Sequence, residues 1–386
     1  MEAASRSVSR LDGWHQVETM TGSFLAWVKP KRHLLGLDIG RSAIKVVQLA
    51  STRKGLVLKY AGLTELPPPD RTAQPDPVGD APLVLLDVLQ KGRLKRQKIV
   101  INFGGRNPII RYILLPKMPK DELAEAVRWE AKKLIPFPIE EAVLDYLVVG
   151  ETQERDLKRI EVLLVAAERT AVMNQLGSLK RINLPVTAMD VNPMALFNTV
   201  KLNYKSDLDE NLVFVDIGAE KMDISISKRG VLRFTRNVQL GGEEITRAVA
   251  QGLGVEREEA EQLKRQKGLS GAGSGEGAAA STVDRDGRRL EIIKAEVDRM
   301  VLETQRSMDY YRAQFREGSV KKIVLMGGAA LMPGFQEYFA SYFDSHVELD
   351  DPFAEILCDE TAFREVRLMS PRFSTGVGLA LRTMDG

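Results

Sequence analysis

The chain has 386 residues, 44% hydrophobic and 28% charged, which is enough apolar material for more than one domain or for one large two-lobed domain. Its 55 basic and 53 acidic residues nearly cancel, which gives no support for a nucleic-acid binder that works through bulk positive charge. The single cysteine, Cys358, cannot form an internal disulfide, and with three histidines a His/Cys metal site is not expected. No apolar run approaches the roughly 20 residues that cross a bilayer.

The N-terminal segment, residues 1–33, places aromatic side chains before a basic cluster. Trp14 and Trp27 precede the cluster at residues 29–33. A weak interfacial membrane contact or a partner-binding tail would have this composition. The alternative, which we expect, is a flexible leader with scattered aromatic residues.

Residues 34–49, LLGLDIGRSAIKVVQL, predict a β-hairpin. An apolar strand ends at Asp38 and Gly40, a short polar turn follows, and a second strand runs over 44–49. A carboxylate at a strand end, beside a turn of backbone N–H groups and Lys45, suits Mg²⁺ and phosphate. An ordinary hairpin with an acid at its mouth is the alternative.

The rest of the first half predicts two blocks of elements. The first has strands at 56–60 and 98–103, separated by a proline-rich loop at 66–82 and a helix at 83–92. The second has the size of a small inserted subdomain, with a strand at 107–115, a helix at 121–134, strands at 143–149 and 160–167 joined by a charged turn, and a helix at 170–182.

The second half returns to the first domain and then begins a new series of strands. Residues 187–190 and a helix at 194–202 belong with the first domain, and 206–211 is a linker. The predicted elements that follow are strands at 212–216, 222–227 and 230–235, a helix from Gly241 to about 251, a charged helix at 255–267, a small-residue linker at 270–281, a helix at 290–315, a strand at 322–326, and helices at 333–343 and 373–381.

The most informative pattern is an internal repeat, because residues 212–218, LVFVDIG, echo residues 34–40, LLGLDIG. Two strand–Asp–Ile–Gly–turn–strand units predict duplicated domains that face each other. A nucleotide between them would have its phosphates held by both hairpins and its metal near Asp38 and Asp216. The glycine pair after strand 322–326 would let the backbone approach a flat ligand closely.

From residue 34 onward the chain resembles the actin-like ATPase superfamily. Residues 38–45 and 216–223 resemble its two phosphate loops, 322–328 its adenosine motif, and 373–380 its second connecting helix. The run EQLK, from Glu261 to Lys264, resembles the E-x-x-K pair that flanks the purine in DnaK-type chaperones and in FtsA. An i,i+3 surface ion pair is the alternative for that pair.

This resemblance implies an α/β fold of two lobes built from duplicated RNase H-like domains, with an FtsA-type inserted α/β subdomain in the first lobe. It implies five parts: a leader at 1–33, subdomain 1A at 34–107 and 185–205, the inserted subdomain 1C at 108–184, subdomain 2A at 206–245 and 318–386, and subdomain 2B at 246–317 with a flexible linker at 270–281.

The resemblance also implies a site for ATP and Mg²⁺. Asp38 and Asp216 would hold the metal, largely through water. Lys45 would reach the phosphates or face solvent. The phosphates would be held by N–H groups of Gly40, Arg41, Ser42, Gly218, Ala219, Glu220 and Lys221. The ribose and purine would be bordered by Gly242, Glu261 and Lys264, with Gly327, Gly328 and Met332 beneath the base.

Two departures from the superfamily bear on catalysis. Arg41 stands where many relatives carry a small or hydroxyl residue, so its side chain must point away or touch phosphate. Where DnaK-type chaperones place a water-positioning Glu, this chain has Asn192, with Asp190 two residues earlier. An amide orients water but is no useful general base. We therefore expect slow hydrolysis or none, with nucleotide acting mainly as a structural switch.

The segment at 115–146, LPKMPKDELAEAVRWEAKKLIPFPIEEAVLDY, is similar to the PilM family of type IV pilus assembly proteins. That resemblance implies a cytoplasmic protein, peripheral on the inner membrane through its partners. The implied partners are the cytoplasmic N-terminal peptide of PilN, the pilus motor ATPases and platform proteins, without nucleic acid; a homo-oligomer or ring is also allowed. The alternatives are an FtsA-like filament-forming ATPase, a sugar or acetate kinase, and a degenerate protein with an empty nucleotide site.

Overall fold

The structure is a computed structural model that describes residues 33–67, 81–92, 94, 98–103, 108–154, 157–270, 280–315 and 318–382. The leader at 1–32, most of the proline-rich loop and most of the small-residue linker lie outside the described residues. The described chain divides into two compact units: an inserted unit within 105–174 and a larger unit made of 29–104 and 175–386.

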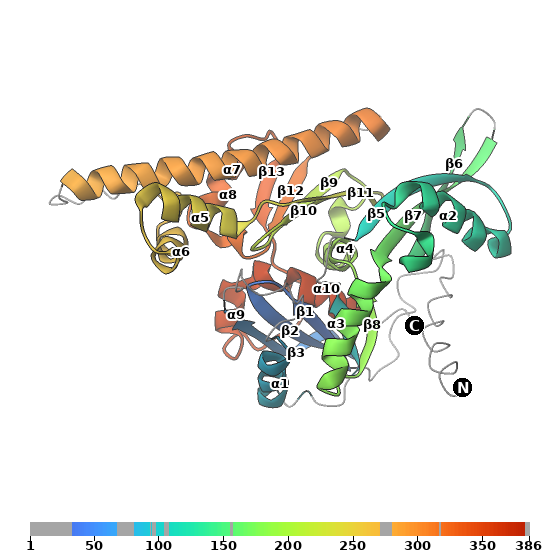
Figure 1. Cartoon of the computed structure of the whole chain (residues 1–386), viewed down its shortest axis with the longest axis horizontal. Coiled ribbons are helices and arrows are strands. Elements are labelled where there is room, and N and C mark those ends of the chain that lie inside the picture. The colour runs from blue at the N-terminus through green and yellow to red at the C-terminus, as the bar shows by residue number, and fades with distance from the viewer. Residues whose placement is uncertain are drawn as a thin grey trace. The chain divides into compact units, whose positions relative to one another are not determined.

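The larger unit contains two five-stranded sheets with the same strand order and the same strand directions (Figure 1). In each, an antiparallel three-stranded meander is followed by two parallel strands. The first sheet, in the order β3-β2-β1-β4-β8, has β1 His33–Ile39, β2 Ala43–Thr52, β3 Gly55–Glu65, β4 Ile99–Asn102 and β8 Val186–Asp190. The second, β11-β10-β9-β12-β13, has β9 Leu212–Ile217, β10 Met222–Lys228, β11 Val231–Val238, β12 Lys322–Met326 and β13 His346–Leu349. The predicted duplication is therefore confirmed.

The first sheet is covered on one face by α1 (Ala81–Lys91) and by the second half of α3 (Arg169–Arg181). Apolar side chains of β1, β2 and β4 pack there against Leu85, Leu89 and Leu179, all fully or almost fully buried. Burial of this apolar area is what stabilises the layer. The strands of the sheet are apolar on both faces, as buried strands flanked by helices are.

The second sheet is covered by α5 (Gly242–Leu253), α7 (Ala280–Phe315) and α8 (Phe335–Ala340), with α6 (Arg257–Gln266) beside α5 (Figure 1). Helix α7 begins about ten residues before the predicted start, so the end of the small-residue segment is helical. Helix α8 is shorter than the predicted 333–343, because Pro333 and Gly334, with a φ of 75°, precede its first residue.

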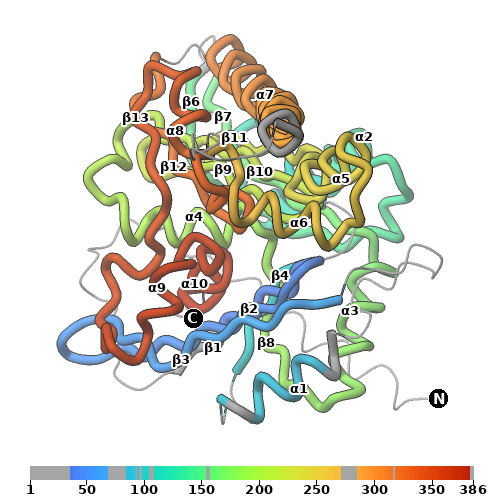
Figure 2. Tube along the Cα trace, turned by 90° about the vertical axis from the view of Figure 1, so that its left-hand side faces the viewer, coloured from blue at the N-terminus to red at the C-terminus, as the bar shows by residue number. Residues whose placement is uncertain are grey.

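Helices α4 (Asn192–Asn203) and α10 (Ser374–Arg382) lie between the two sheets (Figure 2). α4 packs on the second sheet, where Phe197 stacks on Phe214 with ring centroids 6.3 Å apart. α10 packs on β1 and β2 of the first sheet, where Phe373 and Val377 are fully buried. The sequence placed residues 318–386 together in the second lobe, but the segment after β13 packs against the first sheet. The reason is that its apolar face complements β2, a contact that local pattern does not reveal.

Asp350 connects the C-terminal end of α4 to the N-terminal end of α10. Its carboxylate accepts hydrogen bonds from Ser374 Oγ at 2.6 Å and Tyr204 OH at 3.1 Å, and the residue is 1% exposed. Burial raises the pKa of Asp350 to about 7, although the two hydroxyl groups oppose the shift. The native state therefore holds this proton more tightly than the unfolded chain does.

We expect this buried acid to make stability fall as pH rises from about 4 through 7, because folding must then bury a charged carboxylate. An Asp350→Asn variant lacks that charge, so its free energy of unfolding relative to wild type should rise across this window by ~2 kcal/mol. Urea unfolding of both proteins at pH 5 and pH 8 measures the difference. A stability difference that does not change with pH would contradict the prediction.

The inserted unit is a three-stranded antiparallel sheet with α2 (Lys120–Leu134) and the first half of α3. The strand order of the sheet is β5 (Ile109–Pro116), β7 (Leu157–Glu168) and β6 (Ala142–Glu154). Leu123, Val127 and Ala131 of α2 are buried against the sheet, as the predicted helix periodicity requires.

The predicted hairpin is confirmed, but its charged turn is shorter than the predicted 150–159, because β6 extends to Glu154, β7 begins at Leu157, and Gln153 pairs with Lys158. Polar residues on a two-stranded extension need no buried face, so hydropathy does not mark it as strand. The short elements η2 (Ile139–Glu141), η3 (Lys205–Asp207), η4 (Ala329–Leu331), α9 (Arg364–Leu368) and η5 (Ser370–Phe373) complete the described chain. Within it, every helix is too short or too polar to span a bilayer.

Candidate functional site

The two repeated hairpins of the larger unit have the same turn geometry. The N–H of Gly40 donates to the carbonyl of Ala43 at 3.0 Å, and the N–H of Gly218 donates to that of Lys221 at 2.9 Å. Both glycine N–H groups therefore close their own turns, which differs from the expectation that they face a phosphate. The residues after them, Arg41 with Ser42 and Ala219 with Glu220, form the tips of the turns.

Asp38 is held by two side chains at the end of β1. It pairs across the hairpin with Lys45, whose Nζ lies 2.9 Å from Asp38 Oδ2. Asn102 Nδ2 donates to Asp38 Oδ1 at 2.8 Å, and Asp38 is only 5% exposed. The ammonium of Lys45 therefore contacts Asp38 and does not face solvent, whereas its contact with a phosphate stays a prediction.

Asn102, the last residue of β4, is a site residue that the sequence analysis missed. Its Oδ1 accepts the N–H of Ile39 at 2.8 Å, and its Nδ2 also donates to Asn192 Oδ1 at 3.1 Å. One buried amide thus fixes both Asp38 and the first residue of α4. The available signal was a polar residue at the end of an apolar strand, IVIN, which runs beside the strand that carries Asp38.

Asp190 is turned toward a different partner from Asn192. Its carboxylate lies 3.1 Å from Arg382 of α10 and accepts the N–H of Val191 at 2.8 Å. Burial raises the pKa of Asp190, and Arg382 opposes the shift. The predicted pair therefore has separate partners: Asn192 is hydrogen-bonded to Asn102, which also holds Asp38, while Asp190 is paired with Arg382 of α10.

The second hairpin gathers negative charge where the first has an ion pair. Asp216 pairs in register with Asp223, the counterpart of Lys45, and Asp223 accepts a hydrogen bond from Asn237 at 2.7 Å. Burial, with the charges of Asp223 and Asp38, raises the pKa of Asp216 to about 7. Carboxylates that converge in this way fit a divalent cation between the hairpins.

The described residues contain no group of three or more His, Cys, Asp or Glu side chains placed to hold a metal ion directly. Asp38 lies close enough to Asp216 for its charge to help raise the pKa of Asp216. Two such carboxylates fit instead an ion that keeps water and takes further oxygens from a bound phosphate, as Mg²⁺ commonly does.

The glycine pair after β12 packs directly on Asp216. Gly327 has a φ of 86°, and a Cβ there would lie 2.5 Å from Asp216 Oδ1, so no other residue fits. A Cβ on Gly328 would lie 3.6 Å from Nε of Arg372, whose side chain covers this glycine. Met332, expected beneath a base, is 6% exposed and belongs to the core of the second lobe.

An ion pair joins the tips of the two turns. Arg41 Nε donates to Glu220 Oε1 at 3.0 Å, and both side chains are about one-third to two-fifths exposed, at 35% and 43%. The side chain of Arg41 therefore reaches across to the other hairpin. Lys221, at the end of the second turn, adds positive charge to the site. Its charge lowers the pKa of Asp216, but burial and the charge of Asp223 raise that pKa by more.

Helix α5 begins against the second turn. The N–H groups of Gly242 and Glu243 donate to the carbonyls of Gly218 and Ala219 at 3.0 and 2.8 Å. A Cβ on Gly241 would lie 2.4 Å from the Ala219 carbonyl oxygen, so the close approach requires glycine at that position.

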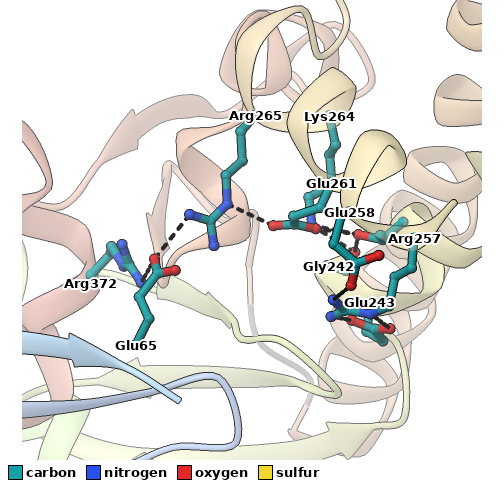
Figure 3. Close-up of polar contacts among 10 residues, drawn as sticks. Glu65, Gly242, Glu243, Arg257, Glu258, Glu261, Lys264, Arg265 and Arg372 are labelled. Atoms are coloured by element: carbon teal, nitrogen blue, oxygen red, sulfur yellow. Dashed lines mark hydrogen bonds and ion pairs between the residues drawn. The ribbon is translucent and has the colours of Figure 1, made fainter. Parts of the chain in front are cut away.

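Glu261 and Lys264 of α6 form a polar cluster with the start of α5 (Figure 3). Lys264 Nζ lies 2.6 Å from Glu261 Oε2, 2.8 Å from Thr246 Oγ1 and 3.0 Å from the Gly242 carbonyl. Burial would raise the pKa of Glu261, but Lys264, Thr246 and Arg265 lower it to about 2. Burial also lowers the pKa of Lys264 more than Glu261 raises it. The pair is therefore an i,i+3 ion pair, as the alternative had it, but it is partly buried: the Lys264 side chain is 10% exposed and that of Glu261 is 22% exposed.

The two sheets have the same strand order, each carries an acid and a glycine turn, and a pair of central helices joins them. This arrangement defines a protein of the actin-like ATPase fold. The sequence profile of the type IV pilus assembly protein PilM matches residues 36–384. The chain therefore belongs to the PilM family.

Solved structures and curated proteins were also similar to the chain. A chain of a PilM-PilN type IV pilus biogenesis complex is 27% identical, with a TM-score of 0.76, over 92% of this chain and 99% of that chain. The ethanolamine utilization protein EutJ from Carboxydothermus hydrogenoformans, 14% identical over 91% of this chain and 90% of that one with a TM-score of 0.50, shares the fold alone.

Curated proteins that match include the cell division protein FtsA. The proteins of Bacillus subtilis (strain 168) and Neisseria meningitidis serogroup B are 23% and 26% identical over 269 and 277 residues, 65% of this chain in each case. These matches cover 58% and 64% of the FtsA chains, so this chain spans less than two thirds of the relatives' length.

Proposed function

We propose that this chain is a cytoplasmic ATP-binding scaffold of the type IV pilus assembly platform, held at the inner membrane by the N-terminal tail of PilN and linked through it to the motor. The observation that carries the proposal is the pair of hairpins with Asp38 and Asp216 at the same register position, in a chain of the PilM family. The subdomain division expected from the sequence is part of this proposal, except for the segment after β13, which packs against the first sheet.

Bound Mg²⁺ would neutralise phosphate charge and orient the triphosphate. Asp38 and Asp216 would hold its water ligands, while Asn102 and Lys45 keep the Asp38 carboxylate in place. The tip residues of the two turns would meet the phosphates with their N–H groups and with the side chains of Arg41 and Lys221. Glu261 and Lys264 would border the ribose, and the Gly327–Gly328 backbone would lie beneath the base.

Slow hydrolysis or none follows from the groups beside Asp38. The amide of Asn192 is already hydrogen-bonded to Asn102, and an amide is no general base. The carboxylate of Asp190 is bonded to Arg382. These contacts favour a nucleotide that acts by being bound, because closure between two lobes is a hinge motion that alters distant surfaces.

The experiment that tests the scaffold role measures binding of a fluorescent peptide with the sequence of the PilN cytoplasmic tail, by anisotropy, to the full chain. We expect saturable binding that Mg·ATP changes by about fivefold or more, the lower end of typical coupling between sites. A scrambled peptide of the same composition is the control. Failure of the tail peptide to bind in either nucleotide state would overturn the proposal.

An FtsA-like filament-forming ATPase is the second candidate, favoured by the FtsA matches. Sedimentation of the chain with and without Mg·ATP, at the same protein concentration, distinguishes the two candidate functions. Nucleotide-dependent pelleting would favour the filament, whereas protein that stays in the supernatant while it binds the PilN peptide would favour the scaffold.

A further inference from the structure

A carboxylate at the edge of the first sheet holds two arginines that lie next to the proposed nucleotide-binding residues. Glu65 Oε1 accepts hydrogen bonds from Arg265 Nη1 at 2.9 Å and from Arg372 Nη2 at 3.3 Å (Figure 3). The proposed roles of the site residues leave all three side chains unexplained. Because the partners come from α6 and η5, the cluster ties β3 to segments far along the chain.

Glu65 is fixed beside the first turn. It is the last residue of β3, and its register partner is Ala43, the first residue of β2. The next N–H, that of Leu66, donates to the Ser42 carbonyl at 2.8 Å. The carboxylate is therefore anchored to the same backbone that forms one phosphate turn.

Each arginine is anchored at the proposed ribose and base positions. Arg265 follows Lys264 on α6, and its Nε donates to Glu261 Oε1 at 2.7 Å. Arg372 lies over Gly328, and the carbonyl of the preceding Pro371 accepts the N–H of Gly327 at 2.9 Å. The two guanidinium groups thus extend from the E-x-x-K pair and from the glycine pair and meet at Glu65.

The cluster stays charged at neutral pH. Burial would raise the pKa of Glu65, but Arg265 and Arg372 hold it below its usual range. The Arg372 side chain is 16% exposed, and its burial lowers its pKa, with Glu65 opposing the shift. Isolated exposed ion pairs contribute little, but a network that includes a largely buried arginine contributes more.

We propose that Glu65 is a positioning residue that holds Arg265 and Arg372 together as a latch beside the nucleobase. Breaking these two contacts limits the rate at which nucleotide leaves. The inference rests on the proposed function, because it requires a nucleotide whose base lies on the Gly327–Gly328 backbone. A base in that position is bordered by Arg372 and by the Glu261–Arg265 pair, so the two arginines stand along its route out.

The test is stopped-flow displacement of a fluorescent ATP analogue, mant-ATP, from the full chain by excess unlabelled ATP. Glu65→Gln keeps the shape and removes the charge. The dissociation rate should rise roughly threefold to tenfold, with little change in the association rate, since network ion pairs of this kind contribute about 1 kcal/mol. Added salt should speed release from wild type more than from the variant.

The matched control is Glu303→Gln. Glu303 also holds two arginines, Arg236 and Arg306, each at 2.6 Å, but all three belong to the second lobe. Its loss should leave the release rate unchanged. An unfolding midpoint for Glu65→Gln that matches the control's would show that the effect is not a general loss of stability.

A double mutant separates a shared latch from two independent effects. Glu65→Gln combined with Arg372→Gln should release mant-ATP no faster than the faster single variant, because both changes break the same contact. Glu65→Asp should give an intermediate rate. Normal binding with an unchanged release rate in Glu65→Gln would overturn the latch alone, whereas a wild-type chain that binds no mant-ATP would overturn the proposed function and the latch with it.

Discussion

An Asp216→Asn variant is expected to bind Mg·ATP roughly tenfold to a hundredfold more weakly than the wild-type chain, because it loses an interaction with a charged group. Binding of ATP in the presence of EDTA should change much less, since the aspartate acts through the metal. The fold itself should be at least as stable at pH 8. Asp216 faces the like charge of Asp223, and burial with the charges of Asp223 and Asp38 raises its pKa to about 7. Stability therefore falls as pH rises from about 4 through 7, and at pH 8 the wild-type chain carries the full cost of this charge.

Asp38→Asn makes an informative comparison at the other hairpin. It should weaken Mg·ATP binding by a similar factor but also lower stability, because Lys45, 2.9 Å away with a side chain only 16% exposed, loses its carboxylate partner. Isothermal titration with and without Mg²⁺, together with thermal unfolding, measures both effects. Asp309→Asn, an exposed aspartate on α7, is the control. Equal Mg·ATP affinity in Asp216→Asn and wild type would remove Asp216 from the metal site.

A Gly378→Ala variant is expected to lose stability by about 3 kcal/mol or more, the upper range for overpacking a tight contact. Gly378 lies where α10 crosses α4, and a Cβ there would meet the Ala195 carbonyl oxygen at 1.7 Å. Backbone cannot move aside as a flexible side chain does, so the two helices must separate. Because these helices connect the two sheets, nucleotide affinity should fall as well.

The matched control for this prediction is Gly287→Ala in the exposed part of α7, where a Cβ meets nothing within 4 Å. That change should be neutral or stabilise the chain by up to about 1 kcal/mol, since alanine favours helix over glycine. Urea unfolding followed by far-ultraviolet circular dichroism compares the two. A Gly378→Ala protein as stable as Gly287→Ala would mean that the helix crossing is not as close as described.

The sequence was sufficient for features that repeat or that have a strong period. The Asp38 and Asp216 hairpins were found because the same seven-residue pattern occurs twice, and α2 because Leu123, Val127 and Ala131 recur at helical spacing. The strand β13 was missed because four residues, His-Val-Glu-Leu, are too few to show an alternating pattern against their neighbours.

The missed site residues have contacts that are distant in sequence. Asn102 meets Asp38 across 64 positions, and Glu65 meets Arg372 across 307. Neither asparagine nor glutamate at a strand end is distinctive by itself, so only the sheet order could bring these residues to the site. The packing of α10 on the first sheet was missed for the same reason.

The most direct test of the central claim is the fate of one bound ATP. Radiolabelled ATP and Mg²⁺ are mixed with an excess of the full chain, and the bound nucleotide is separated and analysed over time. We predict that it stays ATP for far longer than the nucleotide remains bound, since neither Asn192 nor Asp190 is placed to act as a base. Conversion to ADP at the roughly 10 per second typical of enzymes would contradict a scaffold that acts by binding, and so would a chain that binds no ATP.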